Sequence, residues 1–425
     1  MSPPSRRARL SAASASSSPP PTPTPPCAPC TRWCRPTDAR RQSHVRKDHR
    51  PVCQAPLSFR RWAGGEGFHP NLGGHVDQKI PVAILGATGA VGQRFVQLLE
   101  NHPWFQVTAL TGSDRTVGQK YGDGCRWVLP EAMPAYARDM IVVPTEPGFA
   151  GRLAFSALPA DSAKTAEPAL AAAGYAVCSN ASAYRMGTDI PLLIPEVNPE
   201  HTALIPGQQA AHGWPGFIVT NPNCTSTGLT IALKALQGRF GLRRGVVVSL
   251  QALSGAGYPG VASLDILDNV VPYIGGEEEK VETEPRKMLG VYHAGVIEFA
   301  DVRLSAHTNR VAVSDGHLVC ASLEFDAQPA VADVIECLAG FQAPEVVRGL
   351  PSAPQVVIEV RPEADRPQPR KDRWAGGGMT TVVGRVRPDP LFHIKFVVLS
   401  HNTIHGAAGG ALLNGELLVA QGYVR

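Results

Sequence analysis

The sequence contains no uninterrupted apolar run of the roughly 20 residues that a membrane-spanning helix needs, so we expect no membrane association. Its nine cysteines lack the spacing of a disulfide framework, which favours a reducing, cytoplasmic location over secretion. Its 40 basic and 36 acidic residues nearly cancel, so the charge gives no reason to expect nucleic acid as a partner. The 425 residues suffice for two domains with substantial cores.

Residues 1–78 are rich in proline, serine, alanine and arginine, and we predict that they are disordered because they cannot bury enough apolar surface. This composition is typical of a transit peptide, but a reading frame that begins at a wrongly assigned upstream start codon would look the same. We favour the second interpretation. Potential zinc ligands in this segment are Cys27, Cys30, Cys34, His44, His49 and Cys53. They lack a second spaced cysteine pair and a surrounding motif, so we expect no metal site.

A strand, a glycine-rich turn and a helix open the folded region. The apolar run 80–85 predicts a buried parallel strand, GATGAVG follows at 86–92, and apolar residues from 95 to 99 predict a helix. This arrangement binds a dinucleotide, because glycines let the backbone approach the pyrophosphate and the helix N-terminus attracts it. The spacing G-x-x-G-x-x-G departs from G-x-G-x-x-G, so the motif alone leaves a packing role open.

The second strand is predicted at 106–110, and Ser113, Asp114 and Arg115 follow it where the adenosine ribose should lie. An acidic residue there favours NAD, whereas arginine with serine favours the 2′-phosphate of NADP. Ser113 and Arg115 offer two donors, so we prefer NADP.

Alternating strands and helices over 79–223 predict an α/β, Rossmann-like, doubly wound dinucleotide-binding domain. Residues 224–395 predict an α+β catalytic and dimerisation domain with a mixed, largely antiparallel sheet. Residues 396–425 should return to the first domain. We interpret the charged run 277–282 as a solvated helix start and the stretch 362–378 as a loop.

Cys224 is the candidate nucleophile. It lies between a strand end predicted at 217–219 and a helix predicted at 229–236, which places it at a helix N-terminus. A free cysteine has a pKa near ~8.5, and the helix dipole should lower it. On this spacing alone, a small buried cysteine beside a turn is equally consistent. Arg310 and His317 add a candidate base that follows Asp-Gly and heads a predicted strand.

Motifs along most of the chain match one family in order and spacing. They lie at 86–92, 221–224, 251–260, 264–276, 282–285, 306–310, 314–317 and 400–403. From about residue 80 to its end, the chain resembles aspartate-semialdehyde dehydrogenases, and most closely their archaeal and fungal branch. The resemblance implies NADPH-dependent reductive dephosphorylation of L-aspartyl 4-phosphate to L-aspartate 4-semialdehyde, in lysine, threonine and methionine biosynthesis. It also implies a homodimer or homotetramer with the second domain at the interface.

The resemblance implies a role for each matching residue. Cys224 would form the thioester, His317 would be the acid/base, and Gln251 would orient the acyl-enzyme. The substrate residues would be Arg310 for the α-carboxylate, Glu284 for the amino group, Arg185 and Lys287 for the phosphate, and Asn223 beside the nucleophile. The NADP contacts would be Gly86, Thr88, Gly89, Val91, Gly92, Ser113, Arg115, Ser254, Gly255 and Asn402.

The chain departs from the family at three positions. Thr308 stands where cysteine is frequent, Ala312 where proline is frequent, and His405 where arginine is common. The last change could alter a cofactor or interface contact, because histidine is shorter and mostly neutral at pH 7.

Three alternatives remain on the same scaffold. A malonyl-CoA reductase would leave Glu284 without a substrate amino group, and an N-acetyl-γ-glutamyl-phosphate reductase fits the long match over 251–276 less well. A non-catalytic NADP-binding protein would not need the combination of Cys224, Gln251, Arg310 and His317.

Overall fold

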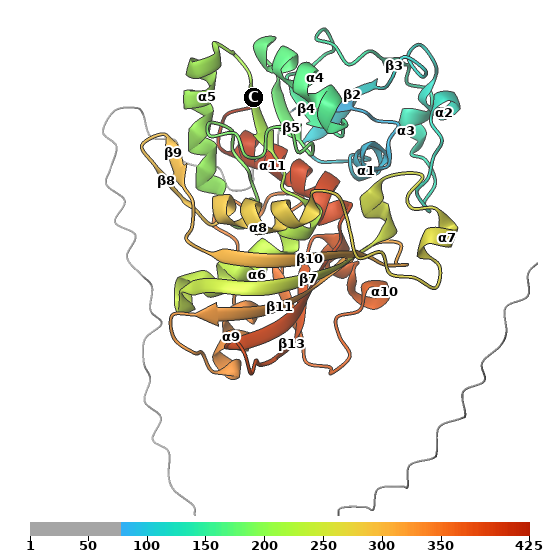
Figure 1. Ribbon diagram of the computed structural model, residues 1–425. Coiled ribbons are helices and arrows are strands. Elements are labelled where there is room, and N and C mark those ends of the chain that lie inside the picture. Colours follow the sequence, from blue (N-terminus) through green and yellow to red (C-terminus); the bar gives the residue numbers. More distant parts are fainter. Residues whose placement is uncertain (1–77) are drawn as a thin grey trace, which may run out of the picture. The chain divides into compact units, whose positions relative to one another are not determined.

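The computed structural model describes residues 78–425. The expectations of disorder and of no zinc site in the N-terminal segment therefore lie outside the described residues. Two six-stranded sheets, one two-stranded antiparallel sheet and the helices around them make up the described part (Figure 1).

The first sheet is entirely parallel and has the order β3-β2-β1-β4-β5-β6. Its strands are β1 (Ile80–Leu85), β2 (Phe105–Thr111), β3 (Val142–Val143), β4 (Leu153–Ser156), β5 (Ala176–Ser179) and β6 (Phe217–Thr220). Its helices are α1 (Ala90–Leu98), α2 (Tyr121–Gly124), α3 (Ala135–Arg138), α4 (Ala160–Ala172), η1 (Pro199–Leu204) and α5 (Ile205–His212). This order confirms the predicted doubly wound domain.

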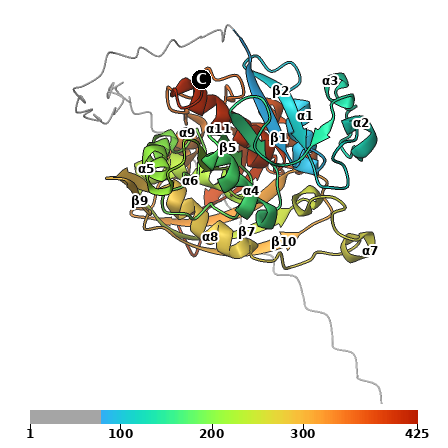
Figure 2. The ribbon, with the colours of Figure 1, turned by 90° about the horizontal axis from the view of Figure 1, so that it is seen from above.

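Successive residues of the central strands are buried on opposite faces, which explains their continuous apolar runs. Ile84 packs in one cluster with Phe95 of α1, whereas Leu85 packs in another with Leu170 of α4. The C-terminal helix α11 (Gly409–Ala420) joins the first cluster through Leu412. Figure 2 shows α11 beside the strands of this sheet.

The second sheet has the order β10-β7-β11-β14-β13-β12. Its strands are β7 (Leu242–Gln251), β10 (Arg303–Arg310), β11 (His317–Phe325), β12 (Ile358–Arg361), β13 (Thr381–Pro388) and β14 (Ile394–Ser400). The β10–β7 and β12–β13 pairs are parallel and the other three are antiparallel, which confirms the predicted mixed, largely antiparallel sheet. β14 belongs wholly to this sheet, and α11, which follows it, contributes Leu412 to the core of the first sheet and Leu413 to the core of the second.

The remaining elements precede, connect or follow the strands of the second sheet in sequence. They are α6 (Cys224–Phe240), η2 (Leu253–Ala256), α7 (Ser263–Ile266), α8 (Glu277–Met288), β8 (Val291–His293), β9 (Val296–Glu298), α9 (Val331–Ala339), α10 (Pro369–Asp372), η3 (Ala375–Gly378) and η4 (Ile404–Ala408). The stretch expected to be a loop thus contains two short helices.

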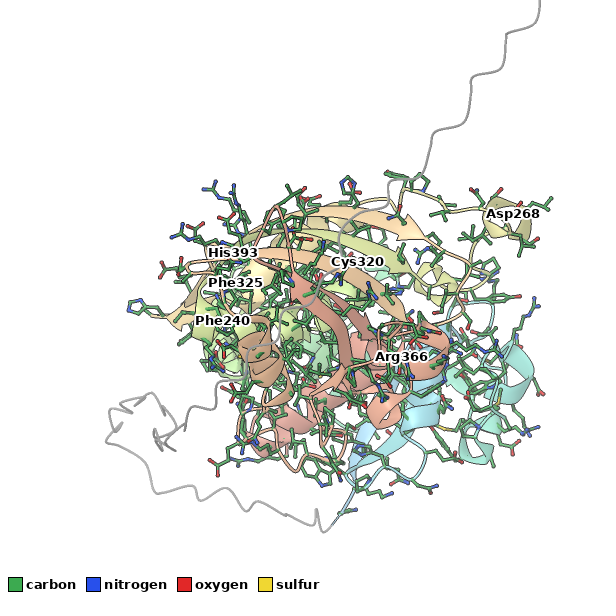
Figure 3. The ribbon with its side chains drawn as sticks, turned by 90° about the horizontal axis from the view of Figure 1, so that it is seen from below. Phe240, Asp268, Cys320, Phe325, Arg366 and His393 are labelled. Atoms are coloured by element: carbon green, nitrogen blue, oxygen red, sulfur yellow. The ribbon has the colours of Figure 1, made fainter. Side chains whose placement is uncertain are left out.

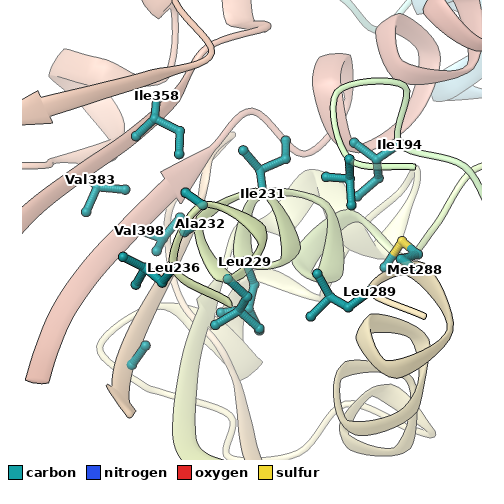
Figure 4. Close-up of a cluster of buried hydrophobic side chains, with 14 of the residues drawn as sticks. Ile194, Leu229, Ile231, Ala232, Leu236, Met288, Leu289, Ile358, Val383 and Val398 are labelled. Atoms are coloured by element: carbon teal, nitrogen blue, oxygen red, sulfur yellow. The ribbon is translucent and has the colours of Figure 1, made fainter. Parts of the chain in front are cut away.

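Helix α6 carries the nucleophile and is held by the largest apolar core (Figure 4). Its Leu236 and Ala232 lie on the side of Val383 and Val398, which belong to the central strands of the second sheet. All four side chains are at least 98% buried. Full burial of a valine or leucine side chain stabilises the fold by roughly 1.5–3 kcal/mol. The packing of these side chains therefore fixes the position of α6.

Helix α8 lies along β10, the edge strand of the second sheet (Figure 1). The carboxylate of Glu282 accepts the Ala306 N–H at 2.9 Å, and that of Glu278 accepts the Thr308 N–H at 3.1 Å. The run 277–282 does begin a helix, but the prediction that it is simply solvated was wrong. Two of its acids, Glu278 and Glu282, are acceptors for backbone donors that the sheet leaves unpaired.

Candidate active site

Three of the predicted site residues, two catalytic and one substrate-binding, come from neighbouring strand ends of the second sheet. Gln251 and Arg310 are opposite one another at the ends of the parallel pair β7 and β10. His317 begins β11, the other neighbour of β7, and lies opposite Ser400 of β14. All three side chains of this group are buried, and Gln251 donates from Nε2 to the Ser249 hydroxyl at 3.2 Å.

Cys224 is the first residue of α6, as the sequence predicted. The Asn223 side chain caps the helix, because its Oδ1 accepts the N–H groups of Thr225 at 2.9 Å and Ser226 at 3.2 Å. The Cys224 Sγ lies 3.2 Å from Nε2 of His317, and the residue as a whole is half-buried. The structure therefore brings together a nucleophile and an imidazole that are 93 residues apart in sequence.

Glycine allows the segment after β14 to approach the nucleophile closely. A Cβ on Gly406 would lie 2.8 Å from the Cys224 Cβ and 2.9 Å from its Cα. A Cβ on Gly255 would lie 2.8 Å from Nη1 of Arg310 and 2.9 Å from Cε1 of His317. At both glycines the backbone packs directly against residues of the site. A side chain at either position would push against Cys224, or against Arg310 and His317.

Two buried carboxylates lie directly behind the nucleophile. Glu284 accepts the Asn223 N–H at 2.6 Å and pairs with Arg185 at 3.0 Å. Glu277 accepts both hydrogen bonds from the Asn223 amide nitrogen, at 2.8 and 2.9 Å. The sequence reasoning missed Glu277 because it is the first of three consecutive glutamates. Its position immediately after two glycines was the only local signal that its environment differs.

The two residues expected at the substrate phosphate have different surroundings. The Lys287 ammonium donates to the carbonyls of Arg185, Gly187 and Ile190 at 2.6–2.7 Å, so its three donors are taken. Arg185 donates from Nη2 to the Asn180 carbonyl at 2.7 Å, and its buried Nε has no hydrogen-bond partner among residues 78–425. The arginine therefore keeps a donor for an anion, whereas the lysine anchors the loop that carries the arginine.

The glycine-rich turn fits a dinucleotide. Gly86 has a φ of 70° and donates its N–H to the Thr111 hydroxyl, while Gly89 precedes α1 and is exposed. A Cβ on Gly92 would lie 2.2 Å from the Gly86 carbonyl oxygen, so this glycine permits the helix to pack on the turn. Thr88 and Val91 remain partly exposed along the same turn. The exposed helix N-terminus is a suitable anion site.

The other expected cofactor residues fall into two groups. Ser113 and Arg115 are exposed just after β2, which suits the additional phosphate of NADP. Asn402 instead links two segments of the second domain, donating to the Ser254 hydroxyl at 2.8 Å and accepting the Gly316 N–H at 2.8 Å. Asn402 and Ser254 therefore also fix the turn that leads to His317.

His405, where the family often has arginine, forms a buried pair with Glu196 at 2.9 Å. It lies in η4, next to the glycine that contacts Cys224. His405 is therefore buried beside the site, where it forms a hydrogen bond with the Glu196 carboxylate.

The surroundings of the nucleophile raise its pKa. Burial and the nearby Glu277 carboxylate raise the pKa of Cys224 to about 12, against the smaller opposing effects of Arg185 and Arg310. Burial, and after it the neighbouring Arg310 and His401, lower the pKa of His317 to about 3. Burial and the Glu277 carboxylate therefore act against the lowering of the thiol pKa that the helix N-terminus is expected to give, and they favour the neutral thiol.

Alkylation of Cys224 by iodoacetamide should therefore stay slow at neutral pH. Because the thiolate is the reactive form and the thiol pKa is raised, the rate is expected to keep rising to at least pH 10. Mass spectrometry of the Cys224 peptide measures the rate, and Cys224→Ser is the control for site assignment. A rate that levels off below pH 8 would contradict this assignment of charge.

The fold and the site define a dehydrogenase in which a dinucleotide-binding domain meets a second domain that bears a cysteine nucleophile. Two family models match the chain, the semialdehyde dehydrogenase NAD binding domain over residues 81–205 and the semialdehyde dehydrogenase dimerisation domain over residues 233–405. The curated aspartate-semialdehyde dehydrogenase of Archaeoglobus fulgidus is 52% identical over 344 residues, which cover 81% of this chain and 99% of the relative. That of Saccharomyces cerevisiae is 44% identical, covering 80% of this chain and 98% of the relative.

The solved structure of aspartate semialdehyde dehydrogenase with NADP from Candida albicans has a TM-score of 0.75 and 42% identity. It covers 82% of this chain and 100% of its own. The chain belongs to the aspartate-semialdehyde dehydrogenase family. Among the described residues, no helix is long and apolar enough to cross a membrane, and no cluster of three or more His, Cys, Asp or Glu side chains could hold a metal ion.

Proposed function

We propose that this protein reduces L-aspartyl 4-phosphate to L-aspartate 4-semialdehyde and releases phosphate, using NADPH, in the biosynthesis of lysine, threonine and methionine. The observation that carries this proposal is the Cys224 thiol at the start of α6, 3.2 Å from His317 and adjacent to the Glu284–Arg185 pair. A thiol supplies a thioester, and the neighbouring charges suit a substrate that carries an ammonium, a carboxylate and a phosphate.

Each residue near the thiol has a role in this reaction. Arg310, fixed by its hydrogen bond to the Ala252 carbonyl at 2.7 Å, would bind the α-carboxylate, and Gln251 would orient the acyl group on Cys224. Glu284 would accept the substrate ammonium with a carboxylate that is already oriented. The Arg185 Nε would donate to the phosphate, and Lys287 would act by holding the Arg185 loop.

The residues around the glycine-rich turn would hold the cofactor, with Gly89 at the pyrophosphate and Arg115 at the 2′-phosphate. When bound, the reduced nicotinamide supplies the hydride. The relative from Candida albicans was solved with NADP, and its 42% identity to this chain supports the same cofactor here.

The carboxylate of Glu284 argues against the other acyl substrates. A malonyl-CoA substrate has no ammonium group, and a buried carboxylate beside its acyl carbon would be an unfavourable neighbour for its own carboxylate. N-acetyl-γ-glutamyl phosphate likewise has an acylated, uncharged nitrogen. The aspartyl substrate gives this carboxylate a cationic partner.

The reverse reaction tests the proposal. The full chain is supplied with L-aspartate 4-semialdehyde, phosphate and NADP, and reduced cofactor is followed by its absorbance. We expect a rate that requires phosphate, and we expect Cys224→Ala to lower it by at least ~10⁴-fold because the covalent step is lost. Absence of the reaction, together with oxidation of NADPH by malonyl-CoA, would overturn the substrate and keep the thiol chemistry. Repeating the assay with NAD tests the cofactor.

We also propose that the protein is a homo-oligomer assembled through its second domain, as a dimer or a tetramer. Leu264 and Leu267, on and after α7, are 89% and 62% exposed, which is unusual for neighbouring leucines of a monomer surface. On the outer face of the second sheet, Cys320 of β11 is exposed (Figure 3). Its register partner on β7, Val248, is partly exposed. The exposed leucines and the outer face of the second sheet support an interface on the second domain. The cysteines of residues 78–425 form no disulfide, which supports a cytoplasmic location.

A double substitution, Leu264→Asp with Leu267→Asp, is expected to weaken this association by about 10- to 100-fold, because it buries charge in an apolar interface. Sedimentation velocity at several protein concentrations measures the change. Leu391→Asp is the matched control, since Leu391 is 86% exposed and lies in the loop between β13 and β14. An unchanged oligomer in the double variant would place the interface elsewhere.

A further inference from the structure

Two carbonyl groups of the glycine-rich turn accept hydrogen bonds from buried side chains outside the glycine motif. The Tyr121 hydroxyl, from the start of α2, donates to the Ala87 carbonyl at 2.8 Å. The Gln93 amide nitrogen, from α1, donates to the Thr88 carbonyl at 2.9 Å. Both donor residues are at least 99% buried, so water cannot take their place in the folded domain.

Gln93 also joins the turn to the segment that follows α2. Its amide nitrogen donates to the Arg126 carbonyl at 2.9 Å, and its Oε1 accepts the Val128 N–H at 2.8 Å. Both N–H donors and the oxygen of this amide are therefore paired. The amide cannot rotate without leaving a buried backbone group unpaired, so three hydrogen bonds fix its orientation.

Strand β2 holds the other side of the same turn. The Thr111 hydroxyl accepts the Gly86 N–H at 3.2 Å, and the Thr111 carbonyl accepts the Ala87 N–H at 2.9 Å. Helix α1 begins after Gly89, which has no side chain with which to cap it. The first N–H groups of α1 thus stay available to an anion.

The direction of the backbone groups decides whether this turn can hold a pyrophosphate. Phosphate oxygens bind to N–H groups, and a carbonyl oxygen that faced the same space would repel them, because both oxygens carry negative charge. Gln93 and Tyr121 hold the Thr88 and Ala87 carbonyls against the interior of the domain. The two side chains therefore determine which backbone groups face the cofactor.

We propose that Gln93 and Tyr121 are positioning residues for the cofactor, which keep the glycine-rich turn in the conformation that binds the pyrophosphate. This inference rests on the proposed NADPH-dependent function and extends it to residues that act through the turn. They act on cofactor binding and not on the acyl group at Cys224. Cofactor affinity should therefore depend on them, while the rate at saturating cofactor should not.

Two conservative substitutions remove these donors. Gln93→Met nearly keeps the volume of the side chain and adds no charge, and Tyr121→Phe removes one hydroxyl. Titration of the full chain with NADPH, without substrate, measures the dissociation constant by cofactor fluorescence. We expect the constant to rise about tenfold in Gln93→Met and about fivefold in Tyr121→Phe, because each leaves a buried carbonyl unpaired. The KM for NADPH should rise alike, with kcat within about twofold of the parent.

Gln97→Met is the matched control on the same helix. Gln97 lies one turn further along α1, and its amide oxygen accepts a hydrogen bond from Arg94 at 2.7 Å. Because Gln97 does not hold the glycine-rich turn, this change should leave the dissociation constant of NADPH as it is in the parent.

A second ligand separates a local effect on the turn from general damage to the domain. 2′-AMP carries the phosphate expected beside Arg115 but has no pyrophosphate, so it should bind the parent and both variants with equal affinity in calorimetric titrations. If 2′-AMP and NADPH are weakened alike, or if NADPH binds Gln93→Met as tightly as the parent, the positioning role is wrong. If Gln93→Met does not fold, Tyr121→Phe decides by the same criteria.

The titrations also separate this inference from the proposed reaction. A parent chain that binds no NADPH would overturn both. A parent chain that binds NADPH but does not act on the aspartyl substrate would overturn the reaction alone, and the affinities of the variants would still decide the role of Gln93 and Tyr121.

Discussion

Glu284→Gln is expected to reduce the free energy of unfolding by about 3–5 kcal/mol, because it leaves the buried Arg185 guanidinium without its counter-charge. The pair is almost fully buried, with an N–O distance of 3.0 Å. The same carboxylate accepts the Asn223 N–H at 2.6 Å, next to the nucleophile. We therefore also expect kcat/KM for the aspartyl substrate to fall by ~100-fold, the order of a lost charged hydrogen bond. Chemical denaturation and steady-state kinetics measure the two effects.

A double-mutant cycle separates the pair from its neighbours. Removing both charges with Arg185→Met and Glu284→Met should cost less stability than the sum of the single changes, because no isolated charge remains buried. Glu278→Gln is the control on the same helix, since its exposed carboxylate pairs with a backbone N–H of β10 and not with an arginine. Additive effects in the cycle would mean that the arginine and the carboxylate act separately.

Gly406→Ala is expected to lower kcat by ~100-fold or more, because the new Cβ would lie 2.8–2.9 Å from the Cβ and Cα of Cys224. The Cys224 backbone cannot rotate away as a flexible side chain could, so the nucleophile itself must shift. A displacement of about 1 Å can cost ~10²-fold in rate. Overpacking should also reduce stability by about 1–3 kcal/mol. Kinetics with saturating substrate and thermal denaturation measure both.

Gly238→Ala is the matched control for this substitution. Gly238 lies in the same helix as Cys224, and a Cβ there meets no atom within 4 Å. Alanine should leave kcat unchanged and raise stability by about 0.5–1 kcal/mol through helix propensity. If Gly406→Ala behaves like this control, the close approach to Cys224 is not required for catalysis.

Local patterns were sufficient for most of the fold. The apolar run at 80–85 is β1 itself, and the glycine-rich turn follows it, because strand, turn and helix signals lie within about a dozen consecutive residues. The short strand β12 and the helix α9 were not anticipated. β12 is partly exposed and, within residues 78–425, pairs only with β13, so its pairing depends on a segment that follows it in sequence.

The sequence was sufficient to choose the residues of the site, but it did not predict their pKa shifts or their contacts. Cys224 and His317 could be chosen from motifs, but the direction of the thiol pKa depends on burial beneath several elements and on Glu277, 53 positions away in sequence. Likewise, nothing local shows that Glu284 and Arg185 meet or that Lys287 donates to three carbonyls. These contacts form between separate segments, so they become visible only in three dimensions.

The acids of α8 along β10 restrict how this protein can meet other chains. Because the outward N–H groups of Ala306 and Thr308 are already satisfied by side-chain carboxylates, an extended peptide cannot join the sheet at that edge by backbone pairing. Recognition on this flank must then be made by side chains, which discriminate between sequences as backbone pairing does not. The same arrangement protects newly made copies from joining one another edge to edge into fibrillar aggregates.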